Sequence, residues 1–94
     1  MISDLEYVAG ELKDQGYTLC GTSVRAPAGI YETALPRMTA FIFGNESEGM
    51  SQAARDLCDL LVSIPMRGGA HSLNITVAMG ICVFEWRRQL ALKQ

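Results

Sequence analysis

The chain has 94 residues, 49% of them hydrophobic, which predicts one domain (1–94) with a modest core. Its net charge of -2 excludes a protein that wraps nucleic acid by bulk electrostatics, because phosphate binding needs clustered Lys and Arg. The sequence lacks the run of about 18 apolar residues that a membrane span needs, and it lacks an N-terminal signal peptide, so no membrane association is expected.

The first half predicts a helix, a strand and a long connection. A capping box and apolar residues at helical spacing predict a helix over 4–15 that ends at Gly16. Residues 17–24 have the β-favouring content of a strand, in which Gly21 marks a bend. Residues 25–37 contain two prolines and a glycine without a clear period. A connection of this length without secondary structure is often functional.

The second half predicts two buried strands and two helices. Residues 38–43 are a continuous apolar run, typical of a parallel strand covered on both faces, and a helix is expected over 50–61. A second buried strand follows at 60–64. A last helix runs from the N-cap Ser72 to about Leu92.

The last helix is apolar almost all round between Leu73 and Phe84, so it should thread through the domain or be covered by a partner. The predicted order is α-β-loop-β-α-β-α, which indicates an α/β domain with a parallel sheet flanked by helices. Ligands in such open sheets bind beyond the carboxyl ends of the strands.

The three cysteines, Cys20, Cys58 and Cys82, lie far apart in apolar runs without metal-ligand spacing. They predict buried, reduced thiols in a cytoplasmic protein, and no metal site.

Two turns follow buried strands. In GNESEG (44–49), Gly44 lets the backbone approach a ligand, and Gly49 leaves N–H groups free at the start of the next helix. This turn lacks the G-K-[ST] of a Walker loop and the middle glycine of a dinucleotide fingerprint. Taken alone, it fits a solvated turn equally well, with Glu48 favouring the helix dipole. The second turn is PMRGGAHS (65–72), whose His71 is interpreted as solvated.

Together, FIFGNESEGM and SIPMRGGAHSLNITVAMGICVFEWRRQ, with 20 residues from Gly44 to Ile64, resemble the SpoU (TrmH-like) family of RNA ribose 2'-O-methyltransferases, in the SPOUT superfamily. The resemblance covers residues 4–92. It implies an α/β domain whose C-terminal segment forms a deep trefoil knot, which accounts for the long connection and the apolar last helix. It also implies S-adenosylmethionine (S-adenosyl-L-methionine) as cofactor and tRNA or rRNA as substrate.

The resemblance further implies site residues. The cofactor, held mostly by backbone groups, is expected at Thr22, Gly44, Ile64, Met66, Ser72 and Leu73. Glu46 and Asn74 match catalytic positions that order the site and the target ribose. The arginine that activates the 2'-hydroxyl in the family belongs to a motif upstream of the first helix. The chain is therefore expected to be the C-terminal portion of a catalytic domain, its N-terminal part missing, with slow chemistry on its own.

Other functions stay open. A non-catalytic cofactor-binding, RNA-binding or dimerisation fragment would keep the knot, whereas a plain nucleotide-binding α/β domain is disfavoured by the missing glycine fingerprint. A homodimer through the last helix is expected from its apolar surface. Phe84 and Trp86 in this helix are interpreted as core or dimer contacts.

Overall fold

The computed structural model describes residues 4–23, 26–43, 50–65 and 75–93. The elements are, in order, α1 (Asp4–Asp14), β1 (Thr18–Thr22), the 3-10 helix η1 (Ile30–Glu32), β2 (Thr39–Ile42), α2 (Gln52–Leu57), β3 (Leu60–Val62) and α3 (Ile75–Leu92). This confirms the predicted order of helices and strands. The connection after β1, expected to lack secondary structure, contains the helical turn η1.

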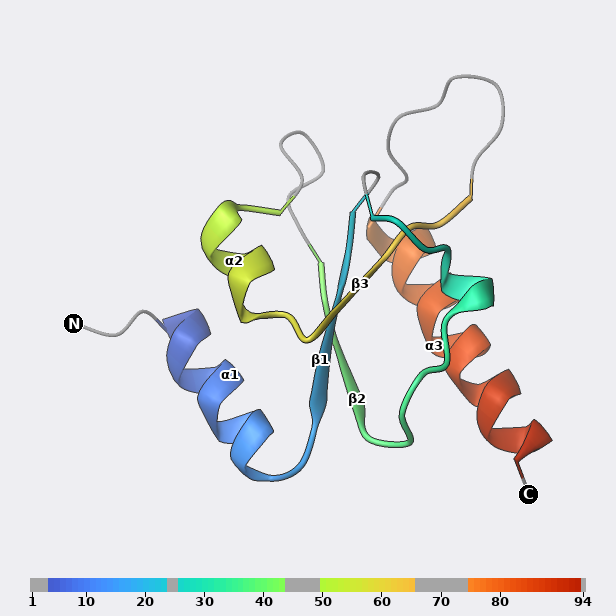
Figure 1. The fold of residues 1–94 in the computed structure, drawn as a ribbon, viewed down its shortest axis with the longest axis horizontal. Coiled ribbons are helices and arrows are strands. Elements are labelled where there is room, and N and C mark those ends of the chain that lie inside the picture. The colour runs from blue at the N-terminus through green and yellow to red at the C-terminus, as the bar shows by residue number, and fades with distance from the viewer. Residues whose placement is uncertain (1–3, 24–25, 44–49, 66–74, 94) are drawn as a thin grey trace.

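The described strands form a parallel sheet in the order β2-β1-β3. Thr18 pairs with Thr39 at one end of β1, and Thr22 pairs with Val62 at the other. Because the strands are parallel, their carboxyl ends share one edge, at the top of Figure 1. The helices α1 and α2 lie on one side of the sheet and α3 lies on the other (Figure 1).

The first helix is one residue shorter than predicted. Gly16 follows it with a φ of 95°, a left-handed conformation that side chains with a Cβ rarely adopt, which confirms that a glycine ends α1. Ser3, the first residue of the predicted capping box, lies outside the described residues.

The strand β2 corrects the prediction that residues 38–43 are covered on both faces. All four residues of β2 are half-buried, and β2 lies at an edge of the sheet. The central strand is β1, in which Leu19, Cys20 and Gly21 are buried. The helices cause this difference, because α1 packs against β1 and α2 packs against α1.

The helix α2 is shorter than the predicted 50–61. Ser51 caps it by accepting a hydrogen bond from Ala54 N–H at 3.1 Å. Cys58 is already extended, with φ -79° and ψ 138°. Asp59 N–H then donates to Leu19 C=O at 2.8 Å. This bond to β1 turns the chain into β3, so a tertiary contact ends the helix where local propensity would continue it.

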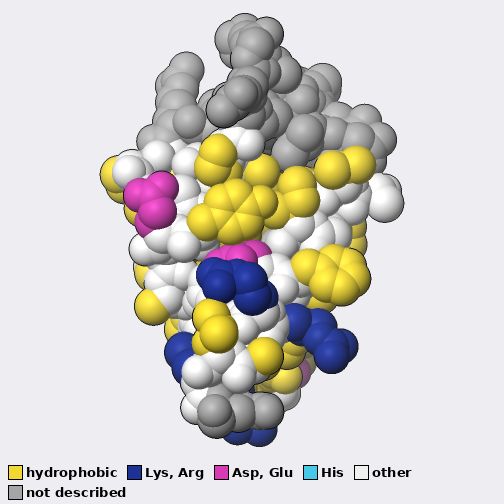
Figure 2. Space-filling model, turned by 90° about the vertical axis from the view of Figure 1, so that its right-hand side faces the viewer, with side chains coloured by type: hydrophobic (Ala, Val, Ile, Leu, Met, Phe, Trp, Pro, Cys, Tyr) yellow, Lys and Arg dark blue, Asp and Glu magenta, His cyan; other side chains and the backbone are white. Residues whose placement is uncertain are grey.

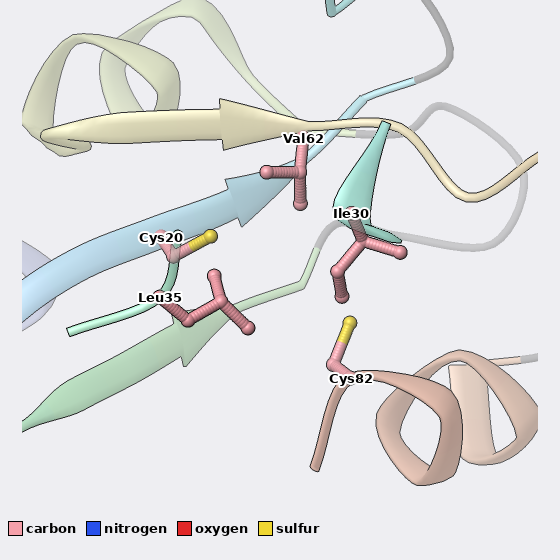
Figure 3. Close-up of a cluster of buried hydrophobic side chains, with 5 residues drawn as sticks. All are labelled: Cys20, Ile30, Leu35, Val62 and Cys82. Atoms are coloured by element: carbon pink, nitrogen blue, oxygen red, sulfur yellow. The ribbon is translucent and has the colours of Figure 1, made fainter. Parts of the chain in front are cut away.

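A buried cluster fills the space between the sheet and α3. It consists of Cys20, Ile30, Leu35, Val62 and Cys82, which point toward one another in Figure 3. Burial raises the pKa of the Cys20 thiol to about 12 and that of Cys82 to about 11. Cys58 is half-buried, which corrects the prediction that all three thiols are buried.

The last helix is not covered on every side within this chain. Its Ala78, Cys82 and Glu85 are buried, whereas Val77 and Phe84 are 51% and 74% exposed. A straight helix presents only one stripe to a small sheet, and the remaining apolar residues face outward. Trp86 is half-buried and packs against the core cluster, which confirms its interpretation as a core residue.

Candidate functional site

The strand ends place two of the predicted site residues on one edge of the sheet. Thr22 is the last residue of β1 and pairs with Val62 of β3. The ladder continues with Ser23 N–H, which donates to Val62 C=O at 2.9 Å. Ile64 follows two residues after Val62, is half-buried and packs against the core cluster. Thr22 and Ile64 therefore belong to neighbouring strand ends.

The other predicted site residues lie outside the described part of the chain; they are Gly44, Glu46, Met66, Ser72, Leu73 and Asn74. The prediction that Gly44, Ile64, Met66 and Leu73 line one cleft therefore stays a prediction. The residues on either side of these segments are described, and they define where the two turns start and end.

The segment 44–49 begins and ends at residues that pack on the sheet. Phe43 packs against the core cluster, with its ring centroid 6.2 Å from that of Phe41. Met50 is 7% exposed, and a Cβ added to Gly21 would lie 2.5 Å from Met50 Cε. The Met50 side chain thus fills the space that Gly21 leaves open, which anchors the second end of the segment.

This contact gives Gly21 a role that sequence reasoning missed. Gly21 was expected to mark a bend, but it pairs regularly with Ile42 and Leu61 inside β1. Its missing side chain makes room for Met50 and Cys58. A glycine inside an apolar strand was the available signal, and it indicates close packing here rather than a bend.

The connection after β1 also reaches this edge. Ser63 N–H donates to Ala28 C=O at 2.9 Å, and Ile30 N–H donates to Ser63 C=O at 2.8 Å. Gly29 and Ser63 thus form a parallel bridge beyond β3. The sequence signalled this only through the unusual length of the connection.

A charged group just before β3 joins its start to β1 and α1, at the end of the sheet opposite to the carboxyl ends of the strands. Asp59 Oδ2 accepts a hydrogen bond from Leu19 N–H at 2.9 Å, and Oδ1 lies 3.4 Å from Lys13 Nζ. The Leu19 hydrogen bond is the main cause that holds the pKa of Asp59 below its usual value, and Lys13 adds to it.

Metal and membrane sites were searched over the same described ranges. Within them, no three His, Cys, Asp or Glu side chains are grouped so that they could hold a metal ion. None of the helices described is both long and apolar enough to cross a bilayer.

The parallel sheet with helices on both sides (Figure 1) places the chain in the class of open α/β domains, in which ligands generally bind beyond the carboxyl ends of the strands. The sequence model of the SpoU rRNA Methylase family matches residues 1–84. The chain therefore belongs to the SpoU rRNA Methylase family, as the two motif segments predict.

Two curated relatives carry the name 23S rRNA (guanosine-2'-O-)-methyltransferase RlmB. The protein of Nitrosomonas europaea is 43% identical over 88 residues, which cover 94% of this chain and 34% of that protein. The protein of Neisseria meningitidis serogroup B is 39% identical over 92 residues, which cover 98% of this chain and 37% of that protein. The chain thus spans about a third of the length of these relatives.

Solved structures share the fold. A TrmH/SpoU tRNA modifying enzyme of A. aeolicus superposes with a TM-score of 0.82 at 31% identity, covering 98% of this chain and 47% of that one. The SpoU methyltransferase AviRb of Streptomyces viridochromogenes, solved with the cofactor AdoMet, gives a TM-score of 0.83 at 32% identity, covering 96% of this chain and 36% of that one.

Proposed function

We propose that this chain is the cofactor-binding part of an S-adenosylmethionine-dependent RNA ribose 2'-O-methyltransferase, with rRNA as its first candidate substrate. One observation carries the proposal: both motif segments, 44–49 and 66–74, follow strands that end at the same edge of the sheet. Membership of the SpoU family, relatives named 23S rRNA methyltransferases and a neighbour solved with AdoMet support it. The proposal includes a cytoplasmic location, because an rRNA substrate would be found there.

The described part of the edge fits an adenosine-containing cofactor. Ile64 is aliphatic and half-buried, and it lies past the last residue of β3, where backbone groups can face a ligand. Thr22 contributes a hydroxyl at the neighbouring strand end. In the proposal, these two residues join four others to hold the cofactor, and these are Gly44, Met66, Ser72 and Leu73. Small and aliphatic residues suit a pocket that binds an adenine edge through backbone groups.

The chemistry demands alignment above all. The cofactor supplies an electrophilic methyl group on a sulfonium, and the enzyme must hold the ribose 2'-hydroxyl in line with it and assist loss of the hydroxyl proton. We assign the ordering of the ribose to Glu46 and Asn74. The proposal places the residue that activates the hydroxyl in the part of the longer relatives that this chain does not match.

The proposal includes a trefoil knot. Its support is that the connection after β1 passes between two elements distant in sequence: Gly29 bridges to Ser63 beyond β3, and Leu35 N–H donates to Gln89 Oε1 of α3 at 2.8 Å. In a knotted chain, the segment that leads into α3 would pass through the loop that this connection forms.

The proposal also includes a homodimer through α3. The outer face of α3 carries an open hollow of about 470 Å³ together with η1; its lining residues are Tyr31, Val77, Gly80, Ile81, Phe84, Glu85 and Arg88. Apolar side chains gather around it in Figure 2, with basic groups below. A second copy that covers this face would remove its apolar surface from water.

Binding and methyl transfer can be measured separately. Calorimetry with S-adenosylhomocysteine should detect binding by the folded chain, and Gly44→Val should abolish it, because a side chain there blocks backbone approach. Gly10→Val is the matched control, since a Cβ at Gly10 meets nothing within 4 Å. A folded chain without cofactor affinity would overturn the proposal.

Tritiated methyl transfer to bulk rRNA and tRNA tests the chemistry. We expect the 94-residue chain to be slower than the full gene product by about 10²–10⁴, because the proposed proton acceptor lies elsewhere. Equal rates would place the catalytic group within this chain, with Glu46 the first candidate. Binding without transfer by either protein would favour the non-catalytic alternative.

A further inference from the structure

A buried carboxylate on α3 has no part in the chemistry proposed above. Glu85 is 4% exposed. Arg88 Nε and Nη2 donate to its two oxygens at 2.7 and 2.8 Å, and Gln89 Nε2 donates to Oε2 at 2.7 Å. Burying a carboxylate is costly unless hydrogen bonds satisfy it, and these three donors offset that cost for Glu85.

Gln89 connects this carboxylate to the segment that precedes β2. Gln89 Oε1 accepts a hydrogen bond from Leu35 N–H at 2.8 Å, while Nε2 donates to Thr33 C=O at 2.9 Å. These two bonds determine the orientation of the amide, because an N–H needs the oxygen and a carbonyl needs the NH₂ group. Glu85 fixes the same orientation from its side by accepting the second proton of Nε2.

Two more side chains of α3 bind the same segment. Trp86 Nε1 donates to the carbonyls of Pro36 and Arg37 at 3.2 and 3.1 Å. Lys93 Nζ lies 3.4 Å from Leu35 C=O. Residues 86, 89 and 93 are spaced by three and four, so one stripe of the helix holds the backbone of residues 33–37. We call Glu85, Trp86, Gln89 and Lys93 the polar latch.

The apolar packing of α3 relies on few large side chains. Its buried apolar residues, Ala78 and Cys82, are small, and Trp86, its large contact with the core cluster, is half-buried. Apolar burial has no directional preference, whereas hydrogen bonds lose strength when their distances and angles change. The latch can therefore set the rotation of α3 and its position along its own axis.

The consequence reaches the other end of the helix. With 18 residues, α3 is about 27 Å long, and it runs from the carboxyl edge of the sheet toward the opposite edge (Figure 1). Because a helix is stiff, a shift at the latch moves its first residue, Ile75. Ile75 directly follows the segment 66–74 in the sequence.

We infer that Glu85 and Gln89 are positioning residues for the cofactor site: they lock α3 onto residues 33–37 and thereby hold the start of α3 at the carboxyl edge. The effect on cofactor binding rests on the proposed function. The attachment of α3 to residues 33–37 does not depend on the proposed function, because it rests only on the hydrogen bonds of Gln89 and Glu85.

The test compares variants in the full gene product. Gln89→Leu removes both bonds to residues 33–37 and should weaken S-adenosylhomocysteine binding about 5- to 150-fold, the usual range for coupled sites. Glu85→Gln keeps an oxygen that can accept from Gln89 and should weaken binding less. Gln15→Leu makes the same change on an exposed residue after α1 and should bind as the wild type.

A second control separates positioning from simple loss of stability. Ala9→Gly removes a buried methyl group from α1, which lies across the sheet from α3 (Figure 1), and destabilises the fold there. All affinities are measured at a temperature where each variant is folded by circular dichroism. Ala9→Gly should then bind normally. Equal weakening by Ala9→Gly and Gln89→Leu, or normal binding by Gln89→Leu, would overturn the inference.

Hydrogen exchange tests the lock independently of the cofactor. The Leu35 amide, which donates to Gln89, should exchange faster in Gln89→Leu, and so should amides in the first turns of α3, but not those of α1. A wild-type protein that binds no cofactor would overturn the proposed function, and exchange would still decide the lock. Unchanged exchange at Leu35 and in α3 would show that the polar latch does not hold α3 onto residues 33–37. If Gln89→Leu is folded only at low temperature, the same comparison is made at that temperature.

Discussion

At the scale of single residues, Gly21 and Met50 form a contact that links the central strand to the residue directly after the segment 44–49. A Cβ at Gly21 would lie 2.5 Å from Met50 Cε and 2.7 Å from Cys58 Sγ, both closer than real contacts allow. The tip of the Met50 side chain can move aside. Cys58 has a short side chain, and its N–H donates to Arg55 C=O, so it can move less. Met50 therefore depends on the absence of a side chain at position 21.

We predict that Gly21→Ala destabilises the protein by about 1–3 kcal/mol, as overpacking usually does, and weakens cofactor binding by displacing Met50. Urea denaturation and calorimetry measure the two effects. Gly10→Ala is the control, because its Cβ has open space and a helical alanine should stabilise by about 0.5–1 kcal/mol. Equal stability of Gly21→Ala and wild type would show that Met50 and Cys58 rearrange freely.

Asp59 gives a prediction about acid stability. Its folded pKa is lowered from 3.8, mainly by the Leu19 N–H, so its stabilisation is present above pH 3.8 and is lost as pH falls through the lower folded value. Asp59→Asn can still accept from Leu19 but no longer titrates. Its unfolding free energy should depend less on pH below about 4 than that of the wild type. Parallel curves from urea melts between pH 2 and 5 would contradict this.

At the scale of elements, α3 combines a buried stripe with an exposed apolar one. The buried stripe faces the core through Cys82, and the exposed one includes Val77 and Phe84. An exposed apolar stripe of this kind is typical of a surface that binds a partner. Trp86, Gln89 and Lys93 of the polar latch hold residues 33–37, whereas Glu85 both accepts from Gln89 and lines the outer hollow that the proposed dimer would cover.

We predict that Phe84→Asp weakens self-association by about 2 kcal/mol or more, because a charge replaces a central apolar contact. Sedimentation equilibrium over a range of concentrations measures the effect. Tyr7→Asp on α1 is the control, since Tyr7 is also exposed but lies away from α3. A wild-type protein that stays monomeric at high concentration would remove the dimer from the proposal.

At the scale of the whole molecule, the core cluster joins the sheet, the connection after β1 and α3. Cys20 comes from β1 and Cys82 from α3, and both are fully buried. Their raised pKa values keep both thiols protonated, which stabilises the fold below pH 9.0 and fades as pH rises toward about 11 and 12.

We predict that alkylation distinguishes the three cysteines. At pH 8, iodoacetamide should modify half-buried Cys58 first, whereas Cys20 and Cys82 should react only on global unfolding and therefore at equal, slow rates. Mass spectrometry of peptides over time measures this. Faster labelling of Cys82 than of Cys20 would show that α3 opens separately from the sheet.

The sequence by itself determined the order of the elements and the family. Helical spacing and glycine stops located α1 and its end at Gly16 within one residue, because these signals depend on neighbours along the chain. Short apolar runs located the strands, and the two motif segments predicted the family that the comparisons confirm.

Only the tertiary structure decided features that depend on residues distant in sequence. The end of α2 depends on the bond from Asp59 to Leu19, and the packing role of Gly21 depends on Met50. The latch joins Gln89 to Leu35, which are 54 residues apart. Propensity and periodicity report local preferences, whereas which polar groups meet in the core is settled only when the sheet and α3 pack together.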